Sequence, residues 1–330
     1  MHNRQQKGKR NMSQNVLVVH GGGPTAVINA SLYGVIEEAK RNPEVGKVYG
    51  AIGGTGAIFS ETFIDLTSFN DEKLKLLLHT PASAIGSSRY PLYEKDYEKM
   101  VDIFKKHDIK YVLLNGGNGT MDACGHIYEV CKDQDIKVVG IPKTIDNDLA
   151  LTDHTPGFGS AAKYIGASTK EVIRDAQGLT YKKSMITIME IMGRNAGWLT
   201  GATALARTED CDGPDLIYLP EVPFDIDKFL TKVKDLIKKK SSVVIAVSEG
   251  IRLADGRYIC ELGSSGDYVD AFGHKQLAGT ATYLANFLAA ECGCKTRAVE
   301  LSTLQRSASH MASRVDIDEA FMVGGAAVKA

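Results

Sequence analysis

Pro142-Lys143-Thr144-Ile145-Asp146-Asn147-Asp148 follows the apolar, mostly β-branched run at residues 136–141. Such a run predicts a buried strand, so the polar segment lies at the carboxyl end of that strand, where α/β proteins place their chemistry. Asp146 and Asp148 are two residues apart and project to one face of an extended backbone, where one can act as a base while the other holds a metal. Lys143 adds a cation beside them.

The same order of elements recurs earlier in the chain. Residues 16–19 form an apolar run that leads into Gly21-Gly22-Gly23-Pro24, and residues 25–40 then carry apolar side chains at helical spacing. Residues 111–114 lead likewise into Gly116-Gly117-Asn118-Gly119-Thr120 and a helical stretch at 121–131. Strands that alternate with helices predict a parallel sheet covered on both faces.

A second block begins near residue 155 and repeats this alternation. Helical patterns cover residues 160–175, 227–240 and 317–329, and strand patterns cover 185–192, 216–219 and 243–247. No Pro/Ser-rich linker separates the blocks, so we expect two domains that share a broad interface. The fold class is therefore α/β, with each domain a mostly parallel sheet flanked by helices.

Composition excludes several classes of protein. The 330 residues are 44% hydrophobic and carry a net charge of -1, which gives no general affinity for nucleic acid or for a membrane. No run of 18 apolar residues occurs, and the basic residues 1–13 read as a disordered tail. The six cysteines are scattered, which is typical of a reduced, cytoplasmic protein.

Glycine pairs after two of the strands favour phosphate binding. Gly22-Gly23 and Gly116-Gly117 let the backbone approach an anion, and each precedes a helix whose first N–H groups are unpaired. The Walker A pattern is absent, and no G-x-G-x-x-G follows a predicted strand, which argues against a Rossmann-type oxidoreductase. Arg89, after Gly86-Ser87-Ser88, offers a guanidinium for bidentate phosphate binding.

Six short motifs together resemble the phosphofructokinase family over residues 15–330. They are Gly-Gly-Pro-Thr-Ala-Val-Ile-Asn-Ala (22–30), Gly-Gly-Asn-Gly-Thr (116–120), Pro-Lys-Thr-Ile-Asp-Asn-Asp (142–148), Met-Gly-Arg (192–194), Ser-Glu-Gly (248–250) and Leu-Gln-Arg (304–306). The resemblance implies a phosphoryl-donor domain at 14–155, to which 307–330 returns, and a sugar-phosphate domain at 156–306. It also implies Mg²⁺ and a homodimer or homotetramer whose active sites a neighbouring subunit completes.

The resemblance further implies a 6-phosphofructokinase, which phosphorylates the 1-hydroxyl of fructose 6-phosphate. Asp146 is similar to the family's catalytic base and Asp148 to its electrostatic partner, and the catalytic group also includes Lys143, Thr144 and Arg194. The implied donor-binding residues are Gly22, Gly23, Arg89, Gly117, Asn118, Gly119 and Thr120. The implied substrate-binding residues are Thr144, Met192, Gly193, Arg194, Glu249, Arg297 and Arg306. Asn118 and Asp148 are the candidate metal ligands.

Three positions bear on the phosphoryl donor. Family members that use ATP carry an Asp where this chain has Asn118. At the position of Lys143, many ATP users carry Gly, whereas pyrophosphate users carry Lys as this chain does. Pyrophosphate users place an Asp at Gly119, which blocks the space for a nucleotide α-phosphate. Because a blocked pocket excludes ATP sterically whereas a lysine can serve either donor, the open Gly119 favours ATP, and pyrophosphate is the alternative.

Two further departures favour another alternative, a non-catalytic or regulatory family member. Met185 stands where ATP-using bacterial members place a subunit-crossing Arg. Family members also continue beyond the Leu-Gln-Arg motif for longer than this chain, which reads as truncated inside its last helix. Intact Asp146, Asp148 and Arg194 argue for the enzyme.

Overall fold

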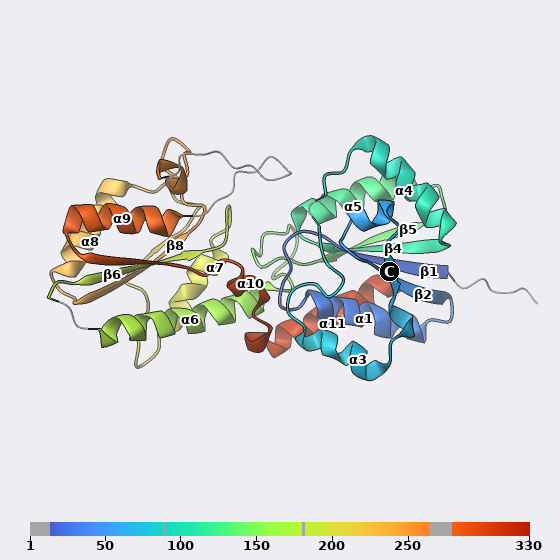
Figure 1. Ribbon diagram of the computed structural model, residues 1–330, viewed down its shortest axis with the longest axis horizontal. Helices are drawn as coiled ribbons and strands as arrows, with labels where there is room; N and C mark the ends of the chain where they lie inside the picture. Colours follow the sequence, from blue (N-terminus) through green and yellow to red (C-terminus); the bar gives the residue numbers. More distant parts are fainter. Residues whose placement is uncertain (1–13, 89, 180–181, 264–278) are drawn as a thin grey trace, which may run out of the picture.

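The computed structural model describes residues 14–88, 90–179, 182–263 and 279–330, and it contains two sheets, each covered by helices (Figure 1). The first sheet has the strand order β3-β2-β1-β4-β5, parallel except for the antiparallel edge strand β3. Its strands are β1 (Gln14–His20), β2 (Val45–Ala51), β3 (Phe63–Asp65), β4 (Ile109–Gly116) and β5 (Lys137–Pro142).

Helices cover both faces of this sheet because its strands are apolar on both sides. Leu17 and Val19 pack against α4 and α5, whereas Val16 and Val18 pack against α1 and α11. The helices are α1 (Ile28–Arg41), α2 (Gly56–Phe59), α3 (Asp71–Lys75), α4 (Glu94–Lys106), α5 (Asn118–Cys131) and α11 (Arg314–Lys329). These elements and the first sheet form the first lobe.

The second lobe is built on a four-stranded sheet in the order β7-β8-β6-β9, in which every pairing is parallel. One of its faces packs against α6 and α7 and the other against α8 and α9. The strands are β6 (Met185–Ile191), β7 (Leu216–Tyr218), β8 (Ser242–Ser248) and β9 (Lys295–Glu300). The helices are α6 (Phe158–Gly178), α7 (Trp198–Ala202), α8 (Ile226–Ile237), α9 (Thr280–Cys292) and α10 (Leu304–Ser307).

Short 3₁₀ turns complete both lobes, and the α/β class predicted from the sequence is confirmed. These turns are η1 (Leu66–Ser68), η2 (Leu76–His79), η3 (Thr203–Ala206), η4 (Ile259–Leu262) and η5 (Ser309–Met311). Among the helices of the described ranges, none is long and apolar enough to cross a membrane.

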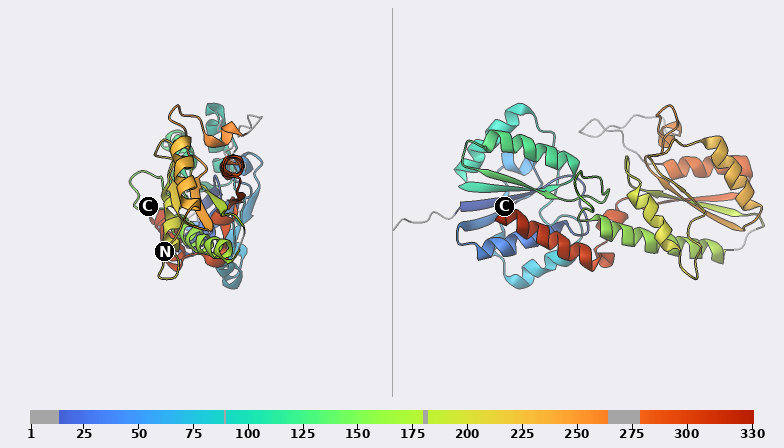
Figure 2. Two further views of the ribbon diagram at one scale, coloured as in Figure 1. Left: turned by 90° about the vertical axis from the view of Figure 1, so that its left-hand side faces the viewer. Right: turned by 180° about the vertical axis from the view of Figure 1, so that it is seen from behind.

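The chain crosses between the lobes twice. It leaves the first lobe after β5 to begin α6, and it returns through α10 so that α11 packs beside α1 (Figure 2). Both crossings lie at the carboxyl ends of strands, so the two lobes face each other across the edges where parallel sheets bind ligands.

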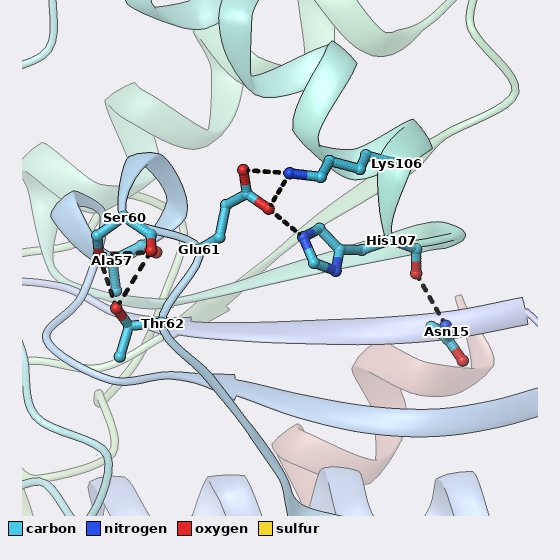
Figure 3. Close-up of polar contacts among 7 residues, drawn as sticks. All are labelled: Asn15, Ala57, Ser60, Glu61, Thr62, Lys106 and His107. Carbon is cyan, nitrogen blue, oxygen red and sulfur yellow. Dashed lines mark hydrogen bonds and ion pairs between the residues drawn. The ribbon is translucent and has the colours of Figure 1, made fainter.

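Polar contacts at the far end of the first lobe fix the position of α4. Glu61 accepts hydrogen bonds from Lys106 Nζ (2.7 Å) and pairs with His107 Nε2 (2.6 Å), and Asn15 Nδ2 donates to the carbonyl oxygen of His107 (2.9 Å) (Figure 3). The hydrogen bonds from Lys106 and His107 hold the pKa of Glu61 below its usual value. Because Tyr97 on α4 lines the cavity described below, this anchoring also sets one wall of the site.

Helices α1 and α11 pack with their backbones in close approach. A Cβ placed on Gly34 would lie 2.0 Å from the carbonyl oxygen of Phe321, and one on Gly324 would lie 2.0 Å from that of Ser31. Neither methyl group fits unless the helices separate, since carbonyl oxygens of a helix cannot move aside. The last helix is therefore fitted to this position by its glycines.

We expect Gly324→Ala to lower the free energy of unfolding by about 1–3 kcal/mol, the usual cost of overpacking. The control is Gly125→Ala, on the exposed side of α5, where an added Cβ meets nothing within 4 Å. That substitution should stabilise by about 0.5–1 kcal/mol because alanine favours the helix. Urea unfolding of both variants measures the difference, and equal shifts would contradict the close packing.

Candidate active site

The carboxyl ends of β4 and β5 bring two of the sequence motifs together. Gly116 at the end of β4 pairs in register with Pro142 at the end of β5, so the glycine turn after β4 lies beside the acidic loop after β5. The N–H of Lys143 donates to the carbonyl oxygen of Gly116 (3.0 Å), which extends the pairing by one residue. The acidic loop therefore begins from a fixed edge of the sheet.

This edge faces the second lobe across a cavity of about 870 Å³. The first lobe lines it with the turns after β1, β4 and β5, and the second lobe lines it with the ends of β6 and β8 and with α10. Of the residues predicted from the sequence, the cavity is lined by Gly22, Gly23, Gly117, Asn118, Gly119, Thr120, Lys143, Thr144, Asp146, Asp148, Met192, Arg194, Glu249 and Arg306.

Asp146 is the half-buried carboxylate of the acidic loop. Burial raises its pKa to about 6, the negative charge of Asp148 raises it further, and the cations Lys143, Arg194 and Arg306 oppose both effects. At neutral pH the group is therefore a carboxylate, yet it is more basic than an exposed aspartate. A general base works best with a pKa near the working pH, so this environment suits proton abstraction.

Glu249 follows β8 and faces the same cavity from the second lobe. Burial raises its pKa to about 7, although the N–H of Gly193 donates to its Oε1 (3.3 Å) and favours the charged form. Gly193 itself contributes this backbone contact and is not part of the cavity wall. A carboxyl group that changes charge near neutral pH can accept a hydrogen bond from a sugar hydroxyl when it is ionised.

Cations gather at the glycine turn after β1. Lys143 is 3% exposed and its Nζ donates to the carbonyl oxygen of Gly23 (2.6 Å). A Cβ on Gly23 would lie 2.9 Å from a terminal nitrogen of Arg306, so this guanidinium adjoins the same turn. Burial, and then the charge of Lys143, lowers the pKa of His20 to about 3, so the imidazole below the turn is neutral. The turn can thus hold an anion with several negative charges.

The N-terminus of α5 forms the opposite wall of this anion site. The helix begins at Asn118, and Gly117 before it has no side chain to cap the first N–H groups. These groups and the positive end of the helix dipole attract phosphate. A Cβ on Gly119 would meet nothing within 4 Å, which shows open space at that position.

Of the predicted residues that the structure describes, Arg297 and Gly193 do not line the cavity. Arg297 on β9 is exposed and pairs with Asp175 Oδ2 (2.9 Å), so it does not reach the cavity of its own chain. Gly193 contributes through its backbone, as described above. Arg89 lies outside the described residues. Met185 is fully buried at the start of β6, and its side chain belongs to the core of the second lobe.

Other lining residues were not singled out from the sequence. Gln305 is buried, and its Oε1 accepts the N–H of Met192 (3.1 Å), which joins two of the motifs. Glu190 near the end of β6 accepts the N–H of Ala281 (2.8 Å), and burial raises its pKa to about 6. Tyr90 is half exposed on the first-lobe wall. The Leu-Gln-Arg motif could have identified Gln305, whereas no sequence pattern marks Glu190 or Tyr90 as site residues.

The donor set fits a magnesium ion that binds together with phosphate. In the part of the chain that the structure describes, no group of three or more His, Cys, Asp or Glu side chains could hold a metal. Asp148 and Asn118 are exposed, line the cavity and carry side-chain oxygens that could bind a metal. Mg²⁺ commonly takes one or two protein oxygens and completes its shell with water and substrate phosphates, so this sparse set is compatible with it.

Two mostly parallel sheets that face a cationic, glycine-walled cavity with a basic carboxylate form the arrangement expected of a phosphotransferase. The phosphofructokinase family model matches residues 15–329, so the chain belongs to the phosphofructokinase family. A pyrophosphate-fructose 6-phosphate 1-phosphotransferase from Halomonas elongata is 40% identical over 323 residues, which are 96% of this chain and 76% of the relative. A sulfofructose kinase from Alkalicoccus urumqiensis is 30% identical and covers 95% of this chain and 79% of its own length.

Solved structures agree with this assignment. The crystal structure of a pyrophosphate-dependent phosphofructokinase from Nitrosospira multiformis superposes with a TM-score of 0.85 at 35% identity, over 96% of this chain and 76% of that one. A phosphofructokinase from Pichia pastoris, at 19% identity and a TM-score of 0.73, shares the fold.

Proposed function

We propose that the protein transfers a phosphoryl group from pyrophosphate to the 1-hydroxyl of fructose 6-phosphate, giving fructose 1,6-bisphosphate and phosphate. The observation that carries the proposal is the buried Lys143, whose ammonium lies at the glycine turn of the donor site. The relatives with 40% identity, from Halomonas elongata and Xanthomonas campestris among others, are named as pyrophosphate-dependent enzymes. These names favour pyrophosphate, the alternative donor of the sequence analysis, over ATP.

Asp146 begins the proposed reaction by accepting the proton of the sugar 1-hydroxyl. The hydroxyl oxygen then forms a bond to the nearer phosphorus of pyrophosphate while the bridging P–O bond breaks and phosphate leaves with the bond's electron pair. Lys143, Arg306 and the N–H groups at the start of α5 offset the charge that spreads over the phosphoryl oxygens. Thr144 and Arg194 line the cavity between the acidic loop and β6, where they would orient the transferring group.

The second lobe supplies the proposed sugar site. Glu249 would accept a hydrogen bond from a sugar hydroxyl, Met192 lines the wall beside it, and the N–H of Gly193 holds the Glu249 carboxylate. Bound with the donor, Mg²⁺ would be held by Asp148 and Asn118 and would neutralise part of the phosphate charge. Arg297 pairs with Asp175 and does not line the cavity of its own chain, so in the proposed homodimer or homotetramer it would bind the sugar 6-phosphate of a neighbouring copy.

ATP remains a second candidate donor because of one observation, the open space at Gly119. A nucleotide needs room beyond the transferred phosphoryl group, and this position leaves that room. Tyr90 and Tyr97 on the nearby wall could contact a base. The donor therefore has to be measured on one preparation.

Initial rates with pyrophosphate and with ATP test the proposal. We expect turnover with fructose 6-phosphate and pyrophosphate, and a rate with ATP at least about 10²-fold lower, which corresponds to roughly 3 kcal/mol of transition-state stabilisation. Fructose 1,6-bisphosphate and phosphate should also yield pyrophosphate, since the bonds broken and formed are alike. Turnover with ATP and none with pyrophosphate would contradict the proposal, and no turnover with either would favour a non-catalytic family member.

A further inference from the structure

A buried carboxylate on the last helix caps a helix of the other lobe. Asp316 on α11 is 4% exposed. Its Oδ1 accepts the N–H of Gly157 (2.9 Å), and its Oδ2 accepts the N–H (2.9 Å) and the hydroxyl (2.5 Å) of Ser160. Gly157 is the N-cap of α6 and has no side chain for that purpose. The acceptor that a capping residue normally provides therefore comes from a helix more than 150 residues further along the chain.

The capped segment holds the acidic loop. The N–H of Thr144 donates to the carbonyl oxygen of Pro156 (3.2 Å), and the Thr155 hydroxyl donates to the carbonyl oxygen of Thr144 (2.6 Å). The N–H of Thr155 donates to Asn147 Oδ1 (2.9 Å). Thr144 Oγ1 in turn accepts the N–H of Asp146 (3.1 Å). A continuous set of hydrogen bonds thus runs from Asp316 through residues 155–157 to the proposed base.

The capping helix is itself held rigidly. Helix α11 packs against α1 at the glycine contacts described above, and Ala320 is fully buried in that contact. The N–H of Ser313, the N-cap of α11, donates to the hydroxyl of Ser160 (3.0 Å), so the two helix starts brace each other. Because α6 packs on the sheet of the second lobe, Asp316 joins the two lobes directly beneath the acidic loop.

We propose that Asp316 is a positioning residue for phosphoryl transfer, which it serves by fixing the segment that holds Thr144 and Asp146 in place. This inference rests on the proposed function, since it assigns Asp146 the role of base. A displacement of a reacting group by about 1 Å can lower a rate by about 10²-fold. Loss of one carboxylate oxygen of Asp316 would leave the N–H of Gly157, or the N–H and hydroxyl of Ser160, without an acceptor. The acidic loop could then shift by about 1 Å.

Asp316→Asn tests the proposal, and Asp318→Asn is the matched control. The control residue lies on the same helix, is exposed, and pairs with Arg314 Nε (2.8 Å). We expect Asp316→Asn to lower kcat by about 10²-fold, with the Kd of fructose 6-phosphate, measured by equilibrium dialysis, within about threefold of the parent. Asp318→Asn should keep both values. A folded Asp316→Asn protein with kcat within about threefold of the parent would overturn the proposal.

Hydrogen exchange separates positioning from a general loss of stability. In Asp316→Asn the amides of residues 144–147 and 155–160 should exchange at least about tenfold faster while those of β1 and β4 keep their rates. Faster exchange spread evenly over both sheets would overturn the proposal. This measurement needs no substrate, so it remains decisive if the parent shows no phosphoryl transfer and the proposed function fails.

Thr155→Val decides the question if Asp316→Asn does not fold. Valine keeps nearly the same volume and removes the hydroxyl that donates to Thr144, while the bonds of Asp316 stay in place. A fall in kcat of about tenfold with unchanged sugar binding would support the proposal, and an unchanged kcat in the folded variant would overturn it.

Discussion

Asp146→Asn is expected to lower kcat by at least about 10²-fold, because an amide cannot accept the proton of the sugar hydroxyl. The substitution keeps the size of the side chain, and Asp146 contributes its backbone N–H rather than its carboxylate to the hydrogen bond with Thr144. The fold should therefore be preserved. Steady-state rates with pyrophosphate as donor measure the effect, and a rate within about tenfold of the parent would exclude Asp146 as the base.

The pH profile gives an independent reading of the same group. The pKa of Asp146 is raised to about 6, so the carboxylate that acts as base is present above that pH and is lost as pH falls through it. In the parent, kcat/KM should fall about tenfold per pH unit below pH 6. The low residual rate of Asp146→Asn should lack this limb. Asp153→Asn, an exposed change in the same loop, is the control and should keep both the rate and the profile.

Lys143→Met has the second largest expected effect, a loss of about 10²–10³-fold in kcat with pyrophosphate. The ammonium lies buried at the Gly23 turn, where in the proposed reaction it would offset charge on the donor, and methionine fills a similar volume without that charge. Lys137→Met is the matched control, since Lys137 is exposed at the other end of the same strand. Rates measured with both donors report the role of the lysine directly.

Comparing how far Lys143→Met lowers the rate with each donor shows which phosphoryl donor the lysine stabilises. If the lysine acts on pyrophosphate, its loss should lower the pyrophosphate rate far more than any residual ATP rate. An unchanged pyrophosphate rate in the folded variant would contradict the assignment of Lys143 to the donor site.

Sequence patterns predicted the strands that form apolar runs, including the edge strands β5 and β7, and missed strands whose sequences are interrupted, including β2 inside the first sheet and β9 at the edge of the second. The strands β1, β4, β5, β6 and β8 are apolar runs because helices cover both of their faces. The strand β9, with the sequence KTRAVE, is an edge strand in which charged and polar residues leave only Ala298 and Val299 as an apolar pair, so no buried run marks it. The strand β2 contains Gly46, Lys47 and Gly50, which weaken its pattern. Burial on both faces was the signal that the sequence carried.

The cavity was predictable where its residues follow strands within a motif. Asp146, Lys143, Gly22 and Glu249 each come directly after an apolar run, and the parallel sheets bring those strand ends together. The orientation of Arg297 could not be read in this way, because its pairing with Asp175 depends on the packing of β9 beside α6. The donor likewise depended on weighing Gly119 against Lys143, and the names of the relatives favour the donor that Lys143 indicates.

The contact between α1 and α11 also has a consequence for synthesis on the ribosome. The five strands of the first sheet are complete at Pro142, but α11, which covers one of its faces together with α1, extends to Lys329. At typical elongation rates of about 5–20 residues per second, roughly 10–40 seconds separate these two events. During that interval the second lobe is translated, and one apolar face of the first sheet lacks its last helix. We therefore expect the nascent first lobe to expose part of that apolar face until α11 has been synthesised.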